Sequence, residues 1–132
     1  MNSLRVWARW LFIIPFALFG LLHFGPIEFS LPYVPAWLFA PVFWVYAIGV
    51  FLIGFFISAA LKKLDGLASL LLAALLIVFV LTIHIPKAIS GDFLGVIASI
   101  RDVCMASGAI IYGLFLAEDK RFTGKLLLTQ GN

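Results

Sequence analysis

Apolar residues fill four long stretches of this chain, and short polar segments separate them. The stretches run over about residues 6–24, 41–61, 67–85 and 93–117. Each is close to the about 20 apolar residues that a helix needs to cross a bilayer. The runs are continuous, whereas strands of a membrane β-barrel alternate apolar and polar residues. The pattern therefore predicts an all-α fold, an integral membrane bundle of four transmembrane helices that forms a single domain over residues 1–132.

The composition supports lipid as the surroundings of these helices. Hydrophobic residues make up 64% of the chain and charged residues 11%, less than half of the roughly 25% typical of soluble domains. Arg5 and Arg9 precede an apolar run, as in a signal peptide. The segment from Leu22 to Pro26 lacks a small-residue cleavage site, so we expect the first stretch to remain as a helix.

Lysine and arginine are distributed unevenly over the connections between the stretches. In the connections at 25–40 and 86–92, Lys87 is the only lysine or arginine. By the positive-inside rule, both termini and the tail over 118–132 are predicted to be cytoplasmic, with 25–40 as an outer loop. The net charge of +3 is then a signal of topology, and no nucleic acid partner is indicated. The basic residues at the inner ends are Arg5, Arg9, Lys62, Lys63, Lys120, Arg121 and Lys125.

The connections differ in their expected roles. Prolines and aromatic residues make the loop over 25–40 stiff and apolar, so it should lie on or dip into the outer leaflet. The segment from Lys62 to Gly66 is expected only to join two antiparallel helices. Pro86 is expected to end the third helix, because proline interrupts helical hydrogen bonding. Asp92, after Ser90 and Gly91, has the chemistry to cap the fourth helix.

Helical spacing indicates which way the charges in the fourth stretch point. Asp102 and several small residues follow one another at intervals of three to four positions, so they share one face of the helix. This spacing predicts that Asp102 faces the bundle. Arg101 lies one step around the helix, where it either reaches outward or pairs with an acid. A charge inside a bilayer costs at least about 2.5–3.5 kcal/mol, so both need partners or water. The proposed small-residue faces are Ala98, Asp102, Ala106 or Ala109, and Gly113 in the fourth helix, and Val50, Gly54 and Ser58 in the second.

A candidate ligand-binding site follows from depth in the membrane. His23, His84, Arg101 and Asp102 all fall in the outer half, and we expect them to line one cavity roofed by the loop over 25–40. Glu28 and Trp37, both in that loop, are further candidates.

Structural roles remain open for the same residues. The histidines could hydrogen-bond across helices, and the Arg101–Asp102 pair could be an interhelical ion pair. Two histidines are too few to predict a metal site, even with Glu28 or Asp102 as a third ligand. Cys104 is the only cysteine, which excludes an internal disulfide, and it is expected to be buried and inert.

Several short motifs, in order along the chain, resemble one known family. They are Gly20-Leu21-Leu22-His23-Phe24, Val34-Pro35-Ala36-Trp37-Leu38, the run from Pro41 to Gly49, His84-Ile85-Pro86, and the run from Ile100 to Ala109. Their order and spacing over roughly 10–117 resemble the DoxX and DoxX-like membrane proteins. Ser107 departs mildly from the family pattern, which usually has a glycine-like small residue there.

The resemblance implies a multi-pass protein of the bacterial inner (cytoplasmic) membrane. The family takes its name from a small subunit associated with quinol oxidase and thiosulfate:quinone oxidoreductase systems. It suggests an accessory subunit of a quinone-linked redox system, with an envelope oxidoreductase as partner and a quinone as ligand. His23 and His84 would then hydrogen-bond the quinone carbonyls, and Asp102 would take or supply a proton. The chain has no ligand set for haem, flavin or an iron–sulfur cluster, so no cofactor of its own is firmly predicted.

A non-enzymatic role is the alternative. The same cavity could serve a small-molecule transporter, or the bundle could be a membrane scaffold for another protein. Neither an enzymatic activity nor a catalytic residue is assigned, and a homo-oligomer is a further candidate assembly.

Overall fold

The computed structural model describes residues 3–125, and all regular elements in this range are helices. Four helical segments within it are long and apolar enough to cross a membrane, which indicates a multi-pass membrane protein. They are α1 (Ser3–Leu22), α2 (Pro41–Leu61), the segment Asp65–Ile89, and the segment Phe93–Leu116. The predicted tail after residue 125 lies outside the described residues.

The third and fourth segments each change helix type along their length. The third consists of α3 (Asp65–Phe79), the π-helical turn η3 (Val80–His84) and α4 (Ile85–Ile89). The fourth consists of α5 (Phe93–Ile111) and a second π-helical turn, η4 (Tyr112–Leu116). In the connection between α1 and α2, two short 3₁₀ turns follow one another, η1 (Ile27–Phe29) and η2 (Leu31–Tyr33).

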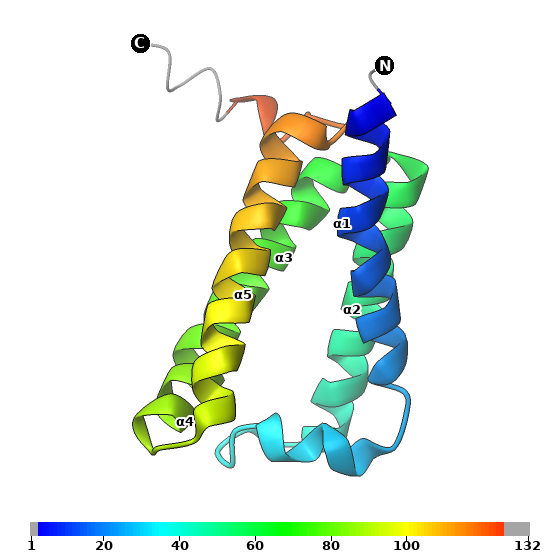
Figure 1. Ribbon diagram of the computed structural model, residues 1–132. Coiled ribbons are helices and arrows are strands. Elements are labelled where there is room, and N and C mark those ends of the chain that lie inside the picture. The colour runs from blue at the N-terminus through cyan, green and yellow to red at the C-terminus, as the bar shows by residue number, and fades with distance from the viewer. Residues whose placement is uncertain (1–2, 126–132) are drawn as a thin grey trace.

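The helices are arranged as two packed pairs, α1 with α2 and α3 with α5 (Figure 1). The pairs lie closer together at the end where α1 begins and η4 ends. They diverge toward the other end, which the η1 and η2 segment crosses (Figure 1). We call these the narrow end and the wide end. Phe12, Phe16, Phe55 and Tyr112 pack ring against ring between the pairs.

Close packing of α1 on α2 depends on two glycines that face one another. A Cβ atom added to Gly20 would lie 3.0 Å from the carbonyl oxygen of Gly49, and the reverse distance is also 3.0 Å. Small residues let backbones approach in this way. The predicted small-residue face of α2 is therefore wrong, since Val50 is 61% exposed and Gly54 faces open space. Almost every residue of α2 is apolar, so its sequence does not mark the packed side.

The small-residue face of α5 is confirmed. Asp102 is buried on it together with Gly95, Ala98, Ala106 and Ala109. Cys104 is exposed, because it lies away from this face, and the expectation that it is buried was wrong. The Asp92 side chain caps α5 as predicted, accepting a hydrogen bond of 2.9 Å from the Leu94 amide.

Pro86 does not end the third membrane segment, contrary to the sequence prediction. The helix passes through η3 and continues as α4 to Ile89. Pro86 lies in the first turn of α4, directly after the π-helical turn. The π-turn before it changes the hydrogen-bonding register, so the chain accommodates the proline without leaving the helix.

Candidate functional site

A cavity of about 720 Å³ lies between the two helix pairs at the wide end. All four membrane segments contribute to its wall, through residues such as Phe16, Ile48, Phe79 and Ile97. The α1–α2 loop also lines it, through Pro26, Phe29, Tyr33, Pro35 and Leu38. Most of the wall is apolar, so the few polar side chains in it stand out.

The four residues predicted to share a cavity do line this one. His23 comes from the end of α1, His84 from η3, and Arg101 and Asp102 from α5. Glu28 and Trp37 are not brought into the lining, and both are exposed. Trp37 is 73% exposed, so its indole faces the surroundings of the loop.

Asp102 is the centre of the polar part of this wall. Its carboxylate is 2% exposed and accepts hydrogen bonds from His84 Nε2 at 3.0 Å and from Arg101 Nε at 2.8 Å. Of the two readings for Arg101, the structure shows the pairing with an acid. The Arg101 guanidinium also lies 5.9 Å from the ring centroid of Phe19, so it links α5 to α1. The buried carboxylate thus has two partners from two helical segments.

This arrangement fixes the tautomer of neutral His84. A carboxylate paired with a guanidinium can only accept, so His84 Nε2 carries the hydrogen and donates it. Its Nδ1 is then an acceptor. That atom is buried and has no hydrogen-bond partner among the described residues. Buried polar atoms are rarely left unpaired. The His84 ring lines the cavity but Nδ1 itself has almost no exposed surface, so a ligand would contact this atom after a small movement of the ring.

Trp44 and His23 are two further residues of the cavity wall with polar side-chain atoms. Trp44 lines the cavity from the first turn of α2, and its Nε1 is likewise buried without a partner in the described part of the chain. Indole nitrogen can only donate. His23 Nδ1 hydrogen-bonds the Phe19 carbonyl oxygen at 2.7 Å, so Nδ1 is the donor and Nε2 the acceptor of the neutral ring. The His23 bond lies within its own helix, not across helices.

Lys87 ties the loop to the third membrane segment. Its Nζ donates to the Pro32 carbonyl oxygen at 2.9 Å and lies 4.5 Å from the ring centroid of Tyr33. Lys87 is thus an anchor of the cavity roof. The sequence marked it only as the single basic residue of the outer connections.

A second buried polar cluster, at the narrow end, was missed from the sequence. Arg9 is 6% exposed, lies 3.5 Å from Asp65 and donates to the Ala59 carbonyl oxygen. Asp65 is fully buried and accepts from the Tyr112 hydroxyl at 3.2 Å and from the amides of Glu118 and Asp119 at 3.0 and 2.9 Å. We call Arg9, Asp65 and Tyr112 the clasp.

The clasp corrects two expectations. Arg9 is not only a flanking charge, since it lies inside α1 and its side chain is turned into the bundle. The segment from Lys62 to Gly66 does more than join helices, because Asp65 ties α3 to α1 and to the chain after η4. An acid that begins an apolar helix, and an arginine inside another, were the signals available in the sequence.

Asp119 extends the network outside the membrane segments. Its carboxylate accepts from Arg121 Nη2 at 2.7 Å and from the Leu64 amide at 3.0 Å. These hydrogen bonds favour the ionised form and hold the pKa of Asp119 well below its ordinary value.

Within residues 3–125 there is no group of three or more His, Cys, Asp or Glu side chains that could hold a metal ion. No protein-family model, no curated protein and no solved structure matches the chain.

Proposed function

We propose that the protein is an accessory membrane subunit that binds a quinone-class head group in the wide-end cavity. In this proposal it belongs to a quinone-linked redox system of the bacterial inner membrane and works beside an envelope oxidoreductase. One observation carries the proposal. The His84 ring lies in the wall of an apolar cavity and is held by Asp102, and its Nδ1 has no hydrogen-bond partner within residues 3–125.

The size and chemistry of the cavity suit such a ligand. Its volume of about 720 Å³ falls within the roughly 300–1,000 Å³ typical of small-molecule sites. A quinone or quinol is a flat apolar ring with polar oxygens on its edge. The aromatic and aliphatic walls would hold the ring, and His84 and Trp44 offer one acceptor and one donor for the oxygens.

The tautomers refine the roles expected of the two histidines. In their neutral forms His84 Nδ1 and His23 Nε2 are acceptors, so they match the hydroxyl groups of a quinol better than the carbonyls of a quinone. Trp44 Nε1 would donate to a ligand oxygen. Oxidation of a quinol releases two protons and two electrons. One proton would pass to His84 Nδ1, where the Asp102 carboxylate would stabilise the imidazolium that forms, and the other would pass to His23 Nε2. The electrons would pass to the partner protein.

A matched pair of tryptophan variants tests this site. Trp44→Phe removes the buried donor, and we expect binding of a short-chain quinol to weaken by about two- to tenfold, the value of one neutral hydrogen bond. Trp37→Phe makes the same change on an exposed residue outside the cavity and should leave the dissociation constant unchanged. Calorimetric titration of full-length protein in lipid nanodiscs measures both.

Other results would favour other functions. Equal dissociation constants for the two variants and the wild type would overturn binding in the cavity. Uptake of a small solute by proteoliposomes, without quinol binding, would favour the transporter alternative. Co-purification of a membrane partner, with no bound small molecule, would favour the scaffold.

The proposed topology puts both termini in the cytoplasm and the cavity in the outer leaflet. It rests on seven basic residues at the narrow end against Lys87 and Arg101 toward the other. Reporter fusions or cysteine labelling at the Lys62–Lys63 turn test it. Labelling of that turn from the outer side of the membrane would reverse the orientation and move the cavity to the inner leaflet.

A further inference from the structure

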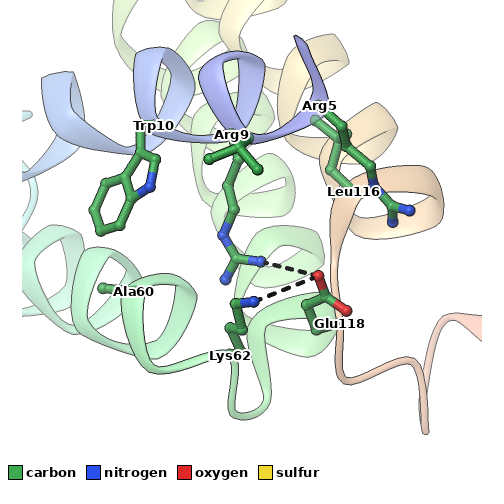
Figure 2. Close-up of a pocket in the computed structure, with 8 residues that line it drawn as sticks. Arg5, Arg9, Trp10, Ala60, Lys62, Leu116 and Glu118 are labelled. Atoms are coloured by element: carbon green, nitrogen blue, oxygen red, sulfur yellow. Dashed lines mark ion pairs between the residues drawn. The ribbon is translucent and has the colours of Figure 1, made fainter. Parts of the chain in front are cut away.

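A small pocket of about 80 Å³ lies at the narrow end, next to the clasp, and Arg9 belongs to both. Figure 2 shows Arg9 of α1 and Lys62 of the α2–α3 turn directed toward Glu118. Arg5 also lines the pocket, one turn before Arg9 on α1. Two cations from two parts of the chain therefore face one carboxylate, and a third cation lines the same pocket.

The single carboxylate does not satisfy these cations. Glu118 Oε1 lies 3.7 Å from both Arg9 Nη1 and Lys62 Nζ, which is an attraction between charges but longer than a hydrogen bond. Arg5 donates to the Phe115 carbonyl oxygen at 2.8 Å, and no described carboxylate lies within ion-pair distance of it. The pocket thus retains N–H donors and an excess of positive charge, the features that a phosphate group needs.

The surroundings of the pocket favour a phosphate attached to a lipid. The narrow end carries seven basic and three acidic residues, a net charge of +4, whereas the rest of the chain carries two basic and three acidic residues. Trp10 lines the pocket and its ring lies 6.5 Å from that of Phe56, which gives an apolar surface across α1 and α2 beside the cations. Basic pockets next to apolar helix surfaces are typical of anionic headgroup sites.

We propose that Arg5, Arg9 and Lys62 bind the phosphate of an anionic phospholipid, with its acyl chains along Trp10 and Phe56. The phosphate takes the place of Glu118 as the main counter-charge of Lys62 and of Arg9 Nη1. Arg9 stays paired with Asp65 through Nη2, so the clasp is kept when lipid binds. This site is separate from the wide-end cavity and does not depend on the function proposed for it.

Adjacent lysines provide a matched test. Lys62→Gln and Lys63→Gln remove the same charge from the same turn, but only Lys62 lines the pocket. The probe is phosphatidylglycerol, added to full-length protein in a neutral detergent, with native mass spectrometry counting bound lipid. We expect Lys62→Gln to weaken phosphatidylglycerol binding by about fivefold and Lys63→Gln by less than twofold.

Two further variants strengthen the test. Glu118→Gln removes the competing carboxylate while keeping the backbone amide that bonds Asp65, so it should tighten lipid binding. Arg5→Gln, on an exposed side chain, should weaken it and serves if Lys62→Gln fails to fold, as judged by circular dichroism.

Three outcomes would overturn the proposal. Equal losses for Lys62→Gln and Lys63→Gln would mean diffuse attraction to the basic end. If phosphatidylcholine bound as tightly as phosphatidylglycerol, the net negative charge of the lipid would have no part in binding. Inorganic phosphate that displaces the lipid and stabilises the protein equally well at the same concentration would show that a free anion is the ligand and that the apolar surface has no part.

Discussion

The replacement Asp102→Asn tests whether the buried carboxylate determines if His84 Nδ1 is a hydrogen-bond acceptor or a donor. The variant keeps the size of the side chain but presents one acceptor and one donor where the carboxylate presents only acceptors. Arg101 Nε–H cannot lose its proton, so the amide oxygen should remain opposite Arg101. The amide N–H₂ then faces His84 Nε2, and that ring must move its hydrogen to Nδ1.

The change in His84 should reverse which form of the ligand binds better. If the proposed function holds, Nδ1 of the wild type accepts from a quinol hydroxyl, whereas Nδ1–H of the variant donates to a quinone carbonyl. One neutral hydrogen bond contributes about 0.5–1.5 kcal/mol. Quinol binding loses this amount and quinone binding gains it, so the ratio of the two affinities should change by about 5- to 150-fold.

The assay is calorimetric titration of the protein in nanodiscs with a short-chain quinol under anaerobic reducing conditions, and with the matching quinone. Asp92→Asn is the control. It removes one charge at the same end, outside the cavity lining, and asparagine caps a helix as well as aspartate does. Its ratio of affinities should equal that of the wild type.

The reasoning fails if folded Asp102→Asn binds both forms with the wild-type ratio. Asp102 would then be a structural partner of His84 and Arg101, and its replacement should lower thermal stability without changing ligand preference. Circular dichroism establishes that the variant is folded before the ratio is interpreted.

Three further predictions concern stability. Gly113→Ala should lower the free energy of unfolding by about 1–3 kcal/mol, because the added Cβ would overlap Ser69 Oγ; Gly54→Ala, which meets open space, should not, and thermal unfolding in detergent compares them. Asp65→Asn should lower the free energy of unfolding by up to about 3–5 kcal/mol, since it leaves buried Arg9 with only Glu118, at 3.7 Å, as a charge partner; unchanged resistance to denaturing detergent would contradict this role of the clasp. The pKa of Asp119 is lower in the folded protein than its ordinary value of 3.8, so the unfolded state binds more protons in acid. The stability that Asp119 contributes is present above about pH 4 and is lost as the pH falls below it, and Asp119→Asn should flatten that part of the stability curve.

Much of the wide-end site could be predicted because its signals are local. A charged residue in an apolar helix must face the bundle or find partners, and the small residues around Asp102 marked the packed side of α5. Depth along the helices then grouped His23 and His84 with it. Glu28 and Trp37 shared that depth but lie on a loop, where no helical period indicates direction.

The clasp could not be predicted in the same way. Arg9 and Asp65 are far apart in the sequence. Asp65 begins α3 and Arg9 lies in the first half of α1, where a long basic side chain can usually reach water or lipid headgroups. Their burial follows from the convergence of the helix pairs at the narrow end (Figure 1). No helical period contains that information.

The two π-helical turns explain why helical spacing is an incomplete guide to polar positions in this fold. One extra residue in a turn rotates everything after it by about 100° around the helix axis. η3 contains His84 and precedes Pro86, and η4 contains Tyr112, so each turn holds a buried polar side chain of one of the two clusters. A period of 3.6 residues carried through η3 therefore misplaces the residues of α4 that follow it. The wide-end cavity thus contains the last residue of one π-helical turn, His84, and the clasp contains the first residue of the other, Tyr112, at opposite ends of the two packed segments that run from Asp65 and from Phe93.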